Sequence, residues 1–348
     1  MWDVAIVGSG PAGASCAAFC ASAGLKTLVI ERAIFPREKV CGDCLNPTCW
    51  PVLERLGVAQ QVRSAPHGKL SSVEFISVSG RSVTAPLPEG ENAEIAIKRS
   101  VLDDLLLRRA RSLGAEVREG ETLLAAQREG ETWNLSTKNF SERAKFLVAA
   151  DGRNSTVARL CRLMPRKGPD RVALQTHVPL PSGFGERVVL QLVREGYSGQ
   201  APVGDGLLNL CLVSQPNDLP AIRRWAERKF AISTEHPWRT IAPLARAALP
   251  VSNPGLLLVG DAARVVEPFT GEGIYYALRS GELAAEAIAA VDLARYQRAH
   301  RHLYAGRLWV NALARAAVEH PRLTSALFRL LPNEKRILRR LTTKVVAP

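Results

Sequence analysis

The 348-residue chain lacks any uninterrupted apolar run of the roughly 18–20 residues that a membrane-spanning helix needs. The short apolar segment Val4–Val7 has no basic region before it and leads directly into a glycine-rich turn. It therefore predicts a buried strand rather than a secretory signal. With no membrane span and no export signal in the sequence, we expect a cytoplasmic protein.

Cysteine occurs without the pattern of a disulfide framework. The seven cysteines are an odd number scattered through a large chain, which excludes the small secreted disulfide-rich class. Cys16 and Cys20 lie one helical turn apart among small residues, which predicts helix packing. The segment Cys41–Cys44 has no second Cys-x-x-Cys pair to share a zinc ion, and the six histidines show no metal-ligand spacing. We expect no metal site, although a redox role for Cys41 and Cys44 stays open.

Acidic residues are scarce in the C-terminal segment 295–348. It holds 12 Lys and Arg against two acids, so it carries +10 of the net charge of +13. Nucleic acid is not the expected partner, because no basic patch interleaved with aromatics and no binding motif supports it. A basic amphipathic tail fits an anionic membrane surface, which would make the protein peripheral to the membrane. A solvated basic face packed on the main domain is the alternative.

The start of the chain has the pattern of a strand–turn–helix–strand unit. Val4–Val7 predicts a buried strand, Ala12–Ala23 a helix of small residues, and Thr27–Ile30 the next strand. This unit of about 30 residues is what a dinucleotide-binding half requires.

Three glycines in the first turn have separate physical roles. Gly8 permits the tight turn, Gly10 lets the backbone approach a pyrophosphate, and Gly13 allows the helix to pack closely on the strand. The helix that begins at Pro11 and Ala12 turns its partial positive charge toward the phosphates.

An acidic residue ends the second strand of the unit. Glu31 lies 18 residues past Gly13, followed by Arg32. A carboxylate there can accept hydrogen bonds from both ribose hydroxyls of an adenosine. The alternative is a glycine turn and a surface glutamate that bind no ligand. The surrounding strand–turn–helix–strand pattern favours dinucleotide binding.

A second cofactor signal appears about 250 residues later, at Gly260–Asp261. It follows the predicted buried strand Leu256–Val259, so Asp261 stands at a strand's carboxyl end, where ligands of open sheets bind. Of the common dinucleotides only FAD carries a ribityl chain for such a carboxylate. The glycine-rich stretch Gly271–Ile274 then opens the predicted helix Gly273–Ala290, whose backbone N–H groups can stabilise negative charge on a reduced flavin.

A third segment, Asp151–Ser155, follows the predicted buried strand Phe146–Ala150. An aspartate followed by glycine is also a common turn pattern. Only the other FAD-type motifs in the chain suggest that this segment contacts the cofactor or a nicotinamide.

Together these motifs resemble the FAD-dependent oxidoreductases of the para-hydroxybenzoate hydroxylase type, and within them the geranylgeranyl reductase family. The resemblance spans residues 1 to about 290 and is carried by Gly8-x-Gly10-x-x-Gly13, Pro36-Arg37-x-Lys39-x-Cys41-Gly42-Asp43, Arg99-x-x-Leu102-Asp103, Asp151-Gly152-x-x-Ser155, Gly260-Asp261-Ala262-Ala263 and Gly271-Glu272-Gly273-Ile274. It implies that Arg99 reaches the FAD and that Arg37 or Lys39 lies near it.

The fold expected from this resemblance is α/β (α+β): a Rossmann-like FAD-binding domain with a parallel sheet, an inserted antiparallel-sheet substrate domain and a helical C-terminal tail. The FAD-binding domain is expected over residues 1–70, 95–165 and 250–292, the substrate domain over 71–94 and 166–249, and the basic helical region over 293–348. Within them we expect an irregular loop over Phe35–Cys49, a helix over Arg99–Leu113, and a strand over Thr122–Ala126.

The residues expected to bind FAD are distributed over all these motifs. They are Gly8, Gly10, Pro11, Ala12, Gly13, Glu31, Arg32, Cys41, Gly42, Arg99, Asp151, Gly260, Asp261, Gly271, Gly273 and Ile274. No second glycine-rich unit exists for a nicotinamide cofactor. NAD(P)H is expected to dock transiently as electron donor, unless the electrons come from another carrier.

The substrate sheet departs from the family pattern. The resemblance implies a Tyr-x-Trp-x-Phe-Pro motif, and the matching stretch Tyr197–Pro202 keeps its tyrosine and proline but has Gly199 and Ala201 in place of the two aromatic rings. Their loss opens space, which puts a prenyl chain in doubt and leaves room for a bulkier or ring-containing substrate.

The expected function is an FAD-dependent oxidoreductase acting on a lipophilic or ring-containing small molecule, by reduction or dehydrogenation of a carbon–carbon bond at flavin N5. The alternative is a monooxygenase that hydroxylates an aromatic or polyketide ring through a C4a-hydroperoxide. A halogenase and a non-enzymatic flavin binder are further readings. Because the flavin carries the chemistry, no acid–base residue is obvious; Cys41, Asp43 and Tyr197 are the catalytic candidates, and His177 faces either the substrate or the core.

Overall fold

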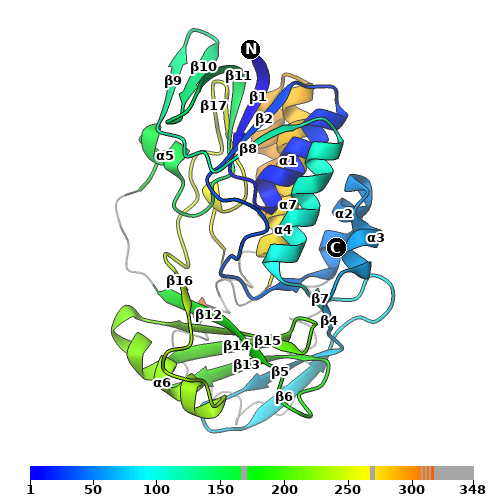
Figure 1. The fold of residues 1–348 in the computed structure, drawn as a ribbon, viewed down its shortest axis with the longest axis vertical. Coiled ribbons are helices and arrows are strands. Elements are labelled where there is room, and N and C mark those ends of the chain that lie inside the picture. The colour runs from blue at the N-terminus through cyan, green and yellow to red at the C-terminus, as the bar shows by residue number, and fades with distance from the viewer. Residues whose placement is uncertain (166–170, 267–270, 307–308, 310–311, 313–314, 317–348) are drawn as a thin grey trace.

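The structure, a computed structural model, describes residues 1–165, 171–266, 271–306, 309, 312, 315 and 316. A large sheet with its helices lies above a second sheet, and short strands connect the two (Figure 1). Most of the basic C-terminal segment and the loop residues Pro268–Thr270 fall outside the described residues.

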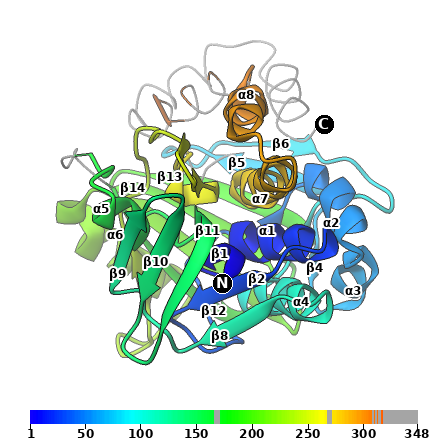
Figure 2. The same ribbon diagram turned by 90° about the horizontal axis from the view of Figure 1, so that it is seen from above.

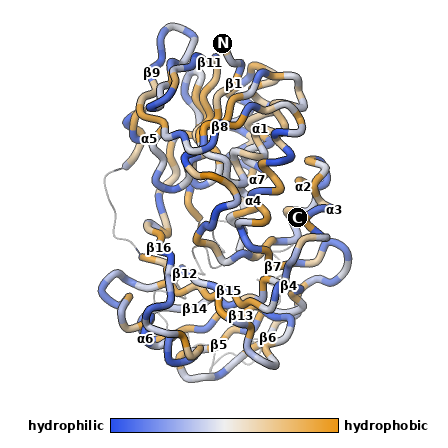
Figure 3. Tube along the Cα trace, viewed as in Figure 1, coloured by the Kyte–Doolittle hydropathy of each residue, from blue (hydrophilic) through white to orange (hydrophobic). Residues whose placement is uncertain are grey.

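The larger sheet has eight strands, and its centre is parallel. The pairs β18·β11, β11·β1, β1·β2 and β2·β8 all run parallel. The central strands β1, β2 and β18 are mostly apolar and buried, whereas the outer loops are hydrophilic (Figure 3). The order is β17 (Ser252–Asn253), β18 (Leu256–Leu258), β11 (Ser141–Ala149), β1 (Trp2–Val7), β2 (Thr27–Glu31) and β8 (Glu116–Glu119), with β10 (Thr132–Ser136) and β9 (Ala125–Glu129) extending from β11.

Helices cover one face of this sheet. Figure 2 shows α1 (Pro11–Ser22) between α7 (Gly273–Ala289) and α4 (Arg99–Ser112), with α8 (Leu293–Tyr304) beyond α7. Cys16 and Cys20 are fully buried in α1, as expected for packing residues. The short α5 (Thr156–Leu160) follows β11.

Glycine sets how closely α1 can approach its neighbours. A Cβ on Gly13 would lie 1.9 Å from the carbonyl oxygen of Gly8, and a Cβ on Gly281 in α7 would lie 2.3 Å from that of Ala12. No side chain fits at either position. The N-terminus of α1 is therefore held against both β1 and α7.

The second sheet has seven strands and a mixed pattern. We expected antiparallel pairing throughout, but β5 runs parallel to β13 while the other neighbours are antiparallel. More than 100 residues separate these two strands, so no hairpin constrains their direction. The order is β16 (Arg239–Ile241), β12 (Val172–Pro179), β15 (Leu207–Ser214), β14 (Gly196–Pro202), β13 (Arg187–Val193), β5 (Ser72–Ile76) and β6 (Ser82–Pro86).

One face of this second sheet is covered by α6 (Leu219–Lys229). Leu210 and Leu212 of β15 pack there with Ile222 of the helix. Residues at the alternate positions Asn209 and Cys211 therefore point to the opposite face, toward the larger sheet. We call this opposite face the inner face.

A three-stranded sheet links the two larger ones. It consists of β3 (Cys44–Leu45), β7 (Ile95–Ala96) and β4 (Gly68–Lys69), with α2 (Trp50–Leu56) and α3 (Ala59–Ser64) beside it. The expectation of an irregular loop up to Cys49 is wrong at its end, because β3 pairs with a distant strand that no local pattern reveals. The strand expected over Thr122–Ala126 lies three residues later, at Ala125–Glu129, where it pairs with β10.

Replacing Gly281 by alanine tests the close contact between α1 and α7. Alanine forms helices better than glycine does, which alone would stabilise the protein. Its Cβ would however meet backbone atoms of Ala12 and Cys16, so overpacking makes the substitution destabilising. We expect the free energy of unfolding to fall by about 1–3 kcal/mol. Gly199→Ala is the matched control, since its Cβ would meet only the end of Leu190 at 3.8 Å. Equal stability of the two variants in thermal unfolding would refute the contact.

Candidate functional site

Three parallel strands of the larger sheet end side by side, and each delivers one of the predicted motifs. Gly8 follows β1, Asp151 follows β11, and Gly260 follows β18. A Cβ on Gly8 would lie 2.6 Å from the carbonyl oxygen of Ala150, so the first two turns touch. This is the edge where ligands of open α/β sheets bind.

The N-terminus of α1 faces basic side chains. Gly10 occupies the N-cap without a side-chain cap, so the first backbone N–H groups of a 12-residue helix point outward. A Cβ on Gly10 would lie 3.7 Å from Arg37 Nη2 and 3.9 Å from Arg99 Nη2. Two guanidinium groups and a helix N-terminus together favour an anion.

Carboxylates hold these two arginines in place. Arg99 donates two hydrogen bonds to Asp103, from Nε at 2.7 Å and Nη2 at 2.8 Å, and Arg37 Nη1 lies 2.8 Å from the same carboxylate. Asp103 is fully buried. One carboxylate therefore positions both cations.

Lys39 joins the same basic cluster. Burial lowers its pKa to about 8, with further lowering by Arg99, Arg37 and Arg153, while Asp261 acts in the opposite direction. We call Arg37, Lys39, Arg99 and Arg153 the basic cluster. Such a concentration of positive charge beside Gly10 fits the pyrophosphate of a dinucleotide.

Glu31 is oriented by backbone and hydroxyl groups at the end of β2. Its Oε2 accepts hydrogen bonds from Ser9 N at 2.7 Å and Ser9 Oγ at 2.9 Å, and its Oε1 accepts one from Ala33 N at 2.8 Å. The buried carboxylate can still accept bonds from ribose hydroxyls, because each oxygen offers two lone pairs. Arg32, beside it, is exposed.

Asp151 and Asp261 have different local partners. Asp151 Oδ2 accepts hydrogen bonds from the backbone N–H groups of Thr156 and Val157, at 2.6 and 3.1 Å, so it caps α5. Burial raises its pKa. Asp261 pairs instead with Arg153, whose Nη2 lies 2.9 Å from Oδ2. A third of the Asp261 side chain is exposed, which leaves it open to a polyol chain.

The start of α7 lies against the Cys41–Cys44 loop. Gly271 has a φ of +69° that favours glycine, and a Cβ there would lie 4.0 Å from Cys44 Cβ. Gly273 is the first residue of α7, and Ile274 is buried. The predicted flavin-edge stretch and the predicted Cys-Gly-Asp loop are thus neighbours.

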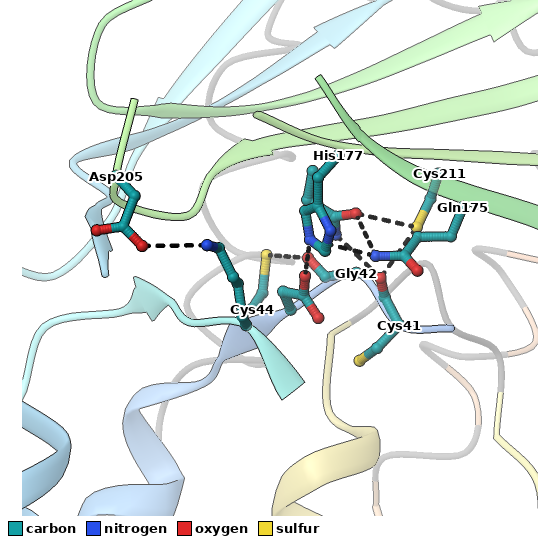
Figure 4. A network of polar contacts seen from close by, with 10 residues as sticks. Cys41, Gly42, Cys44, Gln175, His177, Asp205 and Cys211 are labelled. Atoms are coloured by element: carbon teal, nitrogen blue, oxygen red, sulfur yellow. Dashed lines mark hydrogen bonds and ion pairs between the residues drawn. The ribbon is translucent and has the colours of Figure 1, made fainter. Parts of the chain in front are cut away.

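The inner face of the second sheet holds that loop by its backbone. Asn209 Nδ2 donates to the carbonyl oxygen of Cys41 at 2.9 Å, and Cys211 Sγ contacts the same oxygen at 3.0 Å. Gln175 Nε2 in turn donates to Asn209 Oδ1 at 2.9 Å (Figure 4). Strands β12 and β15 therefore attach the loop to the second sheet.

Asp43 and His177 face each other across this junction. Asp43 Oδ2 lies 2.9 Å from His177 Nε2, and the two residues are 134 positions apart. Asp43 is fully buried and has a φ of +60°, unusual for a residue other than glycine. Burial raises its pKa to about 6, although the hydrogen bond with His177 acts in the opposite direction.

The cysteines around the loop are free thiols. Burial raises the pKa of Cys41, Cys44 and Cys211. A protonated thiol is a poor nucleophile, so these surroundings do not support the redox reading of the Cys-x-x-Cys segment.

The two positions that depart from the family motif lie on the inner face. Gly199 and Ala201 of β14 stand opposite Cys211 and Asn209 of β15, in the same rows as the groups that hold the loop. Tyr197, a catalytic candidate from the sequence, is buried in an apolar cluster with Val213 and Leu244.

Several polar residues of the site were missed by sequence reasoning. Gln175, Asn209 and Cys211 lie on strands that read as apolar, and their only signal was polar residues at alternate positions. Arg246, also missed, donates to the carbonyl oxygens of Asp261 and Ala262. Within the described ranges, no helix is long and apolar enough to span a bilayer, and no group of three or more His, Cys, Asp or Glu could hold a metal ion.

The chain is similar in sequence to known reductases and in fold to a flavin-dependent brominase. Menaquinone reductase of Mycolicibacterium smegmatis is 30% identical over 325 residues, covering 85% of this chain and 78% of the relative. Digeranylgeranylglycerophospholipid reductase of Methanocaldococcus jannaschii is 29% identical, covering 82% of this chain and 76% of the relative. The flavin-dependent brominase Bmp2 superposes with a TM-score of 0.80 at 23% identity, covering 98% of this chain and 93% of that one, so the two share a fold.

The family model described as "FAD binding domain" matches residues 1–183. This range includes the glycine turn, Glu31, the Cys41–Cys44 loop and the whole basic cluster. The chain therefore belongs to the FAD-binding-domain family, as an FAD-dependent oxidoreductase of the para-hydroxybenzoate hydroxylase-like superfamily.

Proposed function

We propose that the protein is an FAD-dependent reductase of a carbon–carbon double bond in a prenyl-bearing lipophilic molecule. The observation that carries this proposal is the similarity to menaquinone reductase and digeranylgeranylglycerophospholipid reductase over more than four fifths of the chain. The substrate would lie between the Cys41–Cys44 loop and the inner face of the second sheet.

The proposed FAD site follows the geometry of the three strand ends. The pyrophosphate would lie against Gly10 and the basic cluster, the adenosine ribose at Glu31 and the ribityl chain at Asp261. The ring would lie at Gly271 and the start of α7. When bound, FAD supplies hydride transfer, and the protein holds it and orients the substrate.

Reduced nicotinamide dinucleotide is the proposed electron donor. The larger sheet contains one glycine turn of the dinucleotide type, which we assign to FAD. The nicotinamide would therefore dock transiently near the ring.

A monooxygenase is the second candidate, and one observation favours it. A Cβ on Gly199 would meet only the end of Leu190 at 3.8 Å, so the position where the family pattern has tryptophan is uncrowded at its base, which supports a ring-containing substrate. The two candidates differ in their need for oxygen, since a reductase needs none.

Replacing Arg37 by methionine tests the proposed pyrophosphate site. This change leaves the Arg99–Asp103 pair intact, so the fold is preserved. We expect the Kd for FAD, measured by fluorescence titration of the deflavinated protein, to rise about 10- to 100-fold, because a hydrogen bond to a charged group contributes roughly 1.5–3 kcal/mol. Arg108→Met is the control, since Arg108 is exposed on α4 and pairs with Asp104. An unchanged Kd for Arg37→Met would place the pyrophosphate elsewhere.

Anaerobic turnover separates the two candidate reactions. The holoprotein is reduced with dithionite and mixed with menaquinone bearing a geranylgeranyl side chain. We expect flavin reoxidation without oxygen and a product that has gained two hydrogens by mass spectrometry. A product that forms only after oxygen is admitted, and that contains an added oxygen atom, would reject the reductase and support the monooxygenase.

Peripheral membrane binding is proposed from α8. Tyr296, His300 and Tyr304 point into the protein, which leaves Arg298 and Arg301 exposed on the opposite face. One face of α8 therefore packs on the main domain, as the alternative of a solvated basic face also expects. The other face presents basic side chains that can contact anionic lipid.

Charge reversal of that surface tests the membrane proposal. We expect the protein to sediment with phosphatidylserine vesicles in low salt, to be released by added salt, and to lose most binding in the double variant Arg298→Glu, Arg301→Glu. Arg108→Glu should bind like the parent protein. Sedimentation that is independent of salt and of both variants would remove α8 from the account.

A further inference from the structure

The proton between Asp43 and His177 can be located from the hydrogen-bond network around it. Asn209 Nδ2 must donate to the carbonyl oxygen of Cys41, so Asn209 Oδ1 is the acceptor for Gln175. This fixes the Gln175 amide with Nε2 facing His177 Nε2 at 3.3 Å. An amide N–H can only donate, so a protonated His177 Nε2 would place two donors against each other. If this nitrogen is unprotonated, its single lone pair faces Asp43 Oδ2 at 2.9 Å, and the Gln175 contact at 3.3 Å is the weaker one. The hydrogen shared with Asp43 Oδ2 therefore lies on the carboxyl group.

The burial of Asp43 agrees with a protonated carboxyl. Its charged form would have to be stabilised without water, and the nearby charges oppose one another: Arg99 lowers the pKa, and Glu38 raises it. The thiols of Cys41 and Cys44 on the same loop are neutral, because burial raises their pKa values.

The other oxygen of Asp43 has no hydrogen-bond partner among the described residues. This atom, Oδ1, is nevertheless buried. A buried polar atom of this kind is costly unless it meets a partner. Its surroundings place it at the junction between Gly271, where the flavin ring is proposed, and the inner face, where the substrate is proposed.

The backbone holds this carboxyl in a fixed position. Asp43 adopts a left-handed φ, a conformation that persists only where surrounding contacts enforce it. Its carbonyl oxygen accepts a hydrogen bond from Ile97 N at 2.9 Å, while the preceding Cys41 carbonyl is bound by Asn209 and Cys211. These contacts come from the second sheet and from the segment that follows β7 of the linking sheet, so the loop is held from two sides.

We propose that Asp43 is the proton donor of the reduction and that His177 is the positioning residue that holds and replenishes its proton. This role rests on the proposed reductase function. One carbon of the double bond accepts a hydride from the reduced cofactor, which a reduced nicotinamide dinucleotide has supplied with electrons. The other carbon accepts the proton as the O–H bond of Asp43 breaks. His177 then takes up a proton from water and passes it back to the carboxylate.

The first test compares half-reactions of Asp43→Asn. The variant keeps the size of the side chain but has no acidic proton. We expect normal FAD binding and normal dithionite reduction, with anaerobic reoxidation by geranylgeranyl menaquinone slowed about 100-fold or more, the usual contribution of a general acid. Asp205→Asn is the control, since Asp205 is half exposed and pairs with Lys98 at the edge of the network. Reoxidation of Asp43→Asn at the parent rate would overturn the proposal while leaving the reductase function intact.

The second test is the pH profile of reoxidation. The acid form is the active one, so the parent rate should fall as pH rises through about 6. His177→Gln should shift this midpoint upward, because the contact with His177 stabilises the ionised carboxylate and so lowers the pKa of Asp43, whereas a merely structural role would not move it. Glu94→Gln should keep the parent profile, although burial raises the pKa of Glu94 to about 7. Loss of the pH dependence in Glu94→Gln would assign the proton to Glu94 instead.

A third readout needs no turnover. Infrared difference spectra of the FAD-loaded protein should show a carboxylic-acid band that titrates near pH 6 and is missing in Asp43→Asn. The band could be present while geranylgeranyl menaquinone fails to reoxidise the reduced parent protein. That result would reject the proposed reductase function but would still show that Asp43 is protonated. An Asp43 carboxylate that is ionised throughout the range would refute the inference itself.

Discussion

The absence of a side chain at Gly13 is the constraint on which the fold and the cofactor site both depend. Any Cβ there would overlap the carbonyl oxygen of Gly8, so only glycine lets α1 lie against the end of β1. Gly281 imposes the same requirement between α1 and α7. These contacts aim the N-terminus of α1 at the basic cluster, and they set the distance from α1 to the helix whose start lies at the proposed flavin ring.

The Cys41–Cys44 loop couples the two sheets. The larger sheet approaches it through Gly271, and the second sheet holds the Cys41 carbonyl through Asn209 and Cys211. The loop carries Asp43, the proton donor that we propose, into the junction between the two sheets. Asp43 is buried there beside His177, and its raised pKa follows from that position.

The sequence was most informative where function depends on local spacing. The glycine turn, Glu31 and the Gly260–Asp261 segment each follow a strand, so their position at one sheet edge could be predicted from the order of elements. The basic cluster was only partly foreseen, because Arg37 and Lys39 lie on a loop without periodicity. The parallel pairing of β5 with β13 could not be predicted, since it joins segments more than 100 residues apart.

The Asp43–His177 pair shows why the rest of the candidate site could not be predicted without the structure. Both residues were noted in the sequence, but His177 could equally have faced the core. Their meeting depends on the register of β12 against β15 and on a left-handed residue in a loop. Polar residues at alternate positions of apolar strands, such as Gln175 and Asn209, were the available signal, and they point to a polar inner face rather than to a particular partner.

The central claim is that one loop places Asp43 between the flavin and the substrate. A crystal structure of the protein with FAD and an unreactive saturated prenyl quinone tests it most directly. We predict the pyrophosphate against Gly10 and Arg37, the ring at Gly271, and Asp43 Oδ1 directed into the space between ring and quinone side chain. A ring bound away from Gly271, or an Asp43 carboxyl screened from both ligands by protein, would contradict the account.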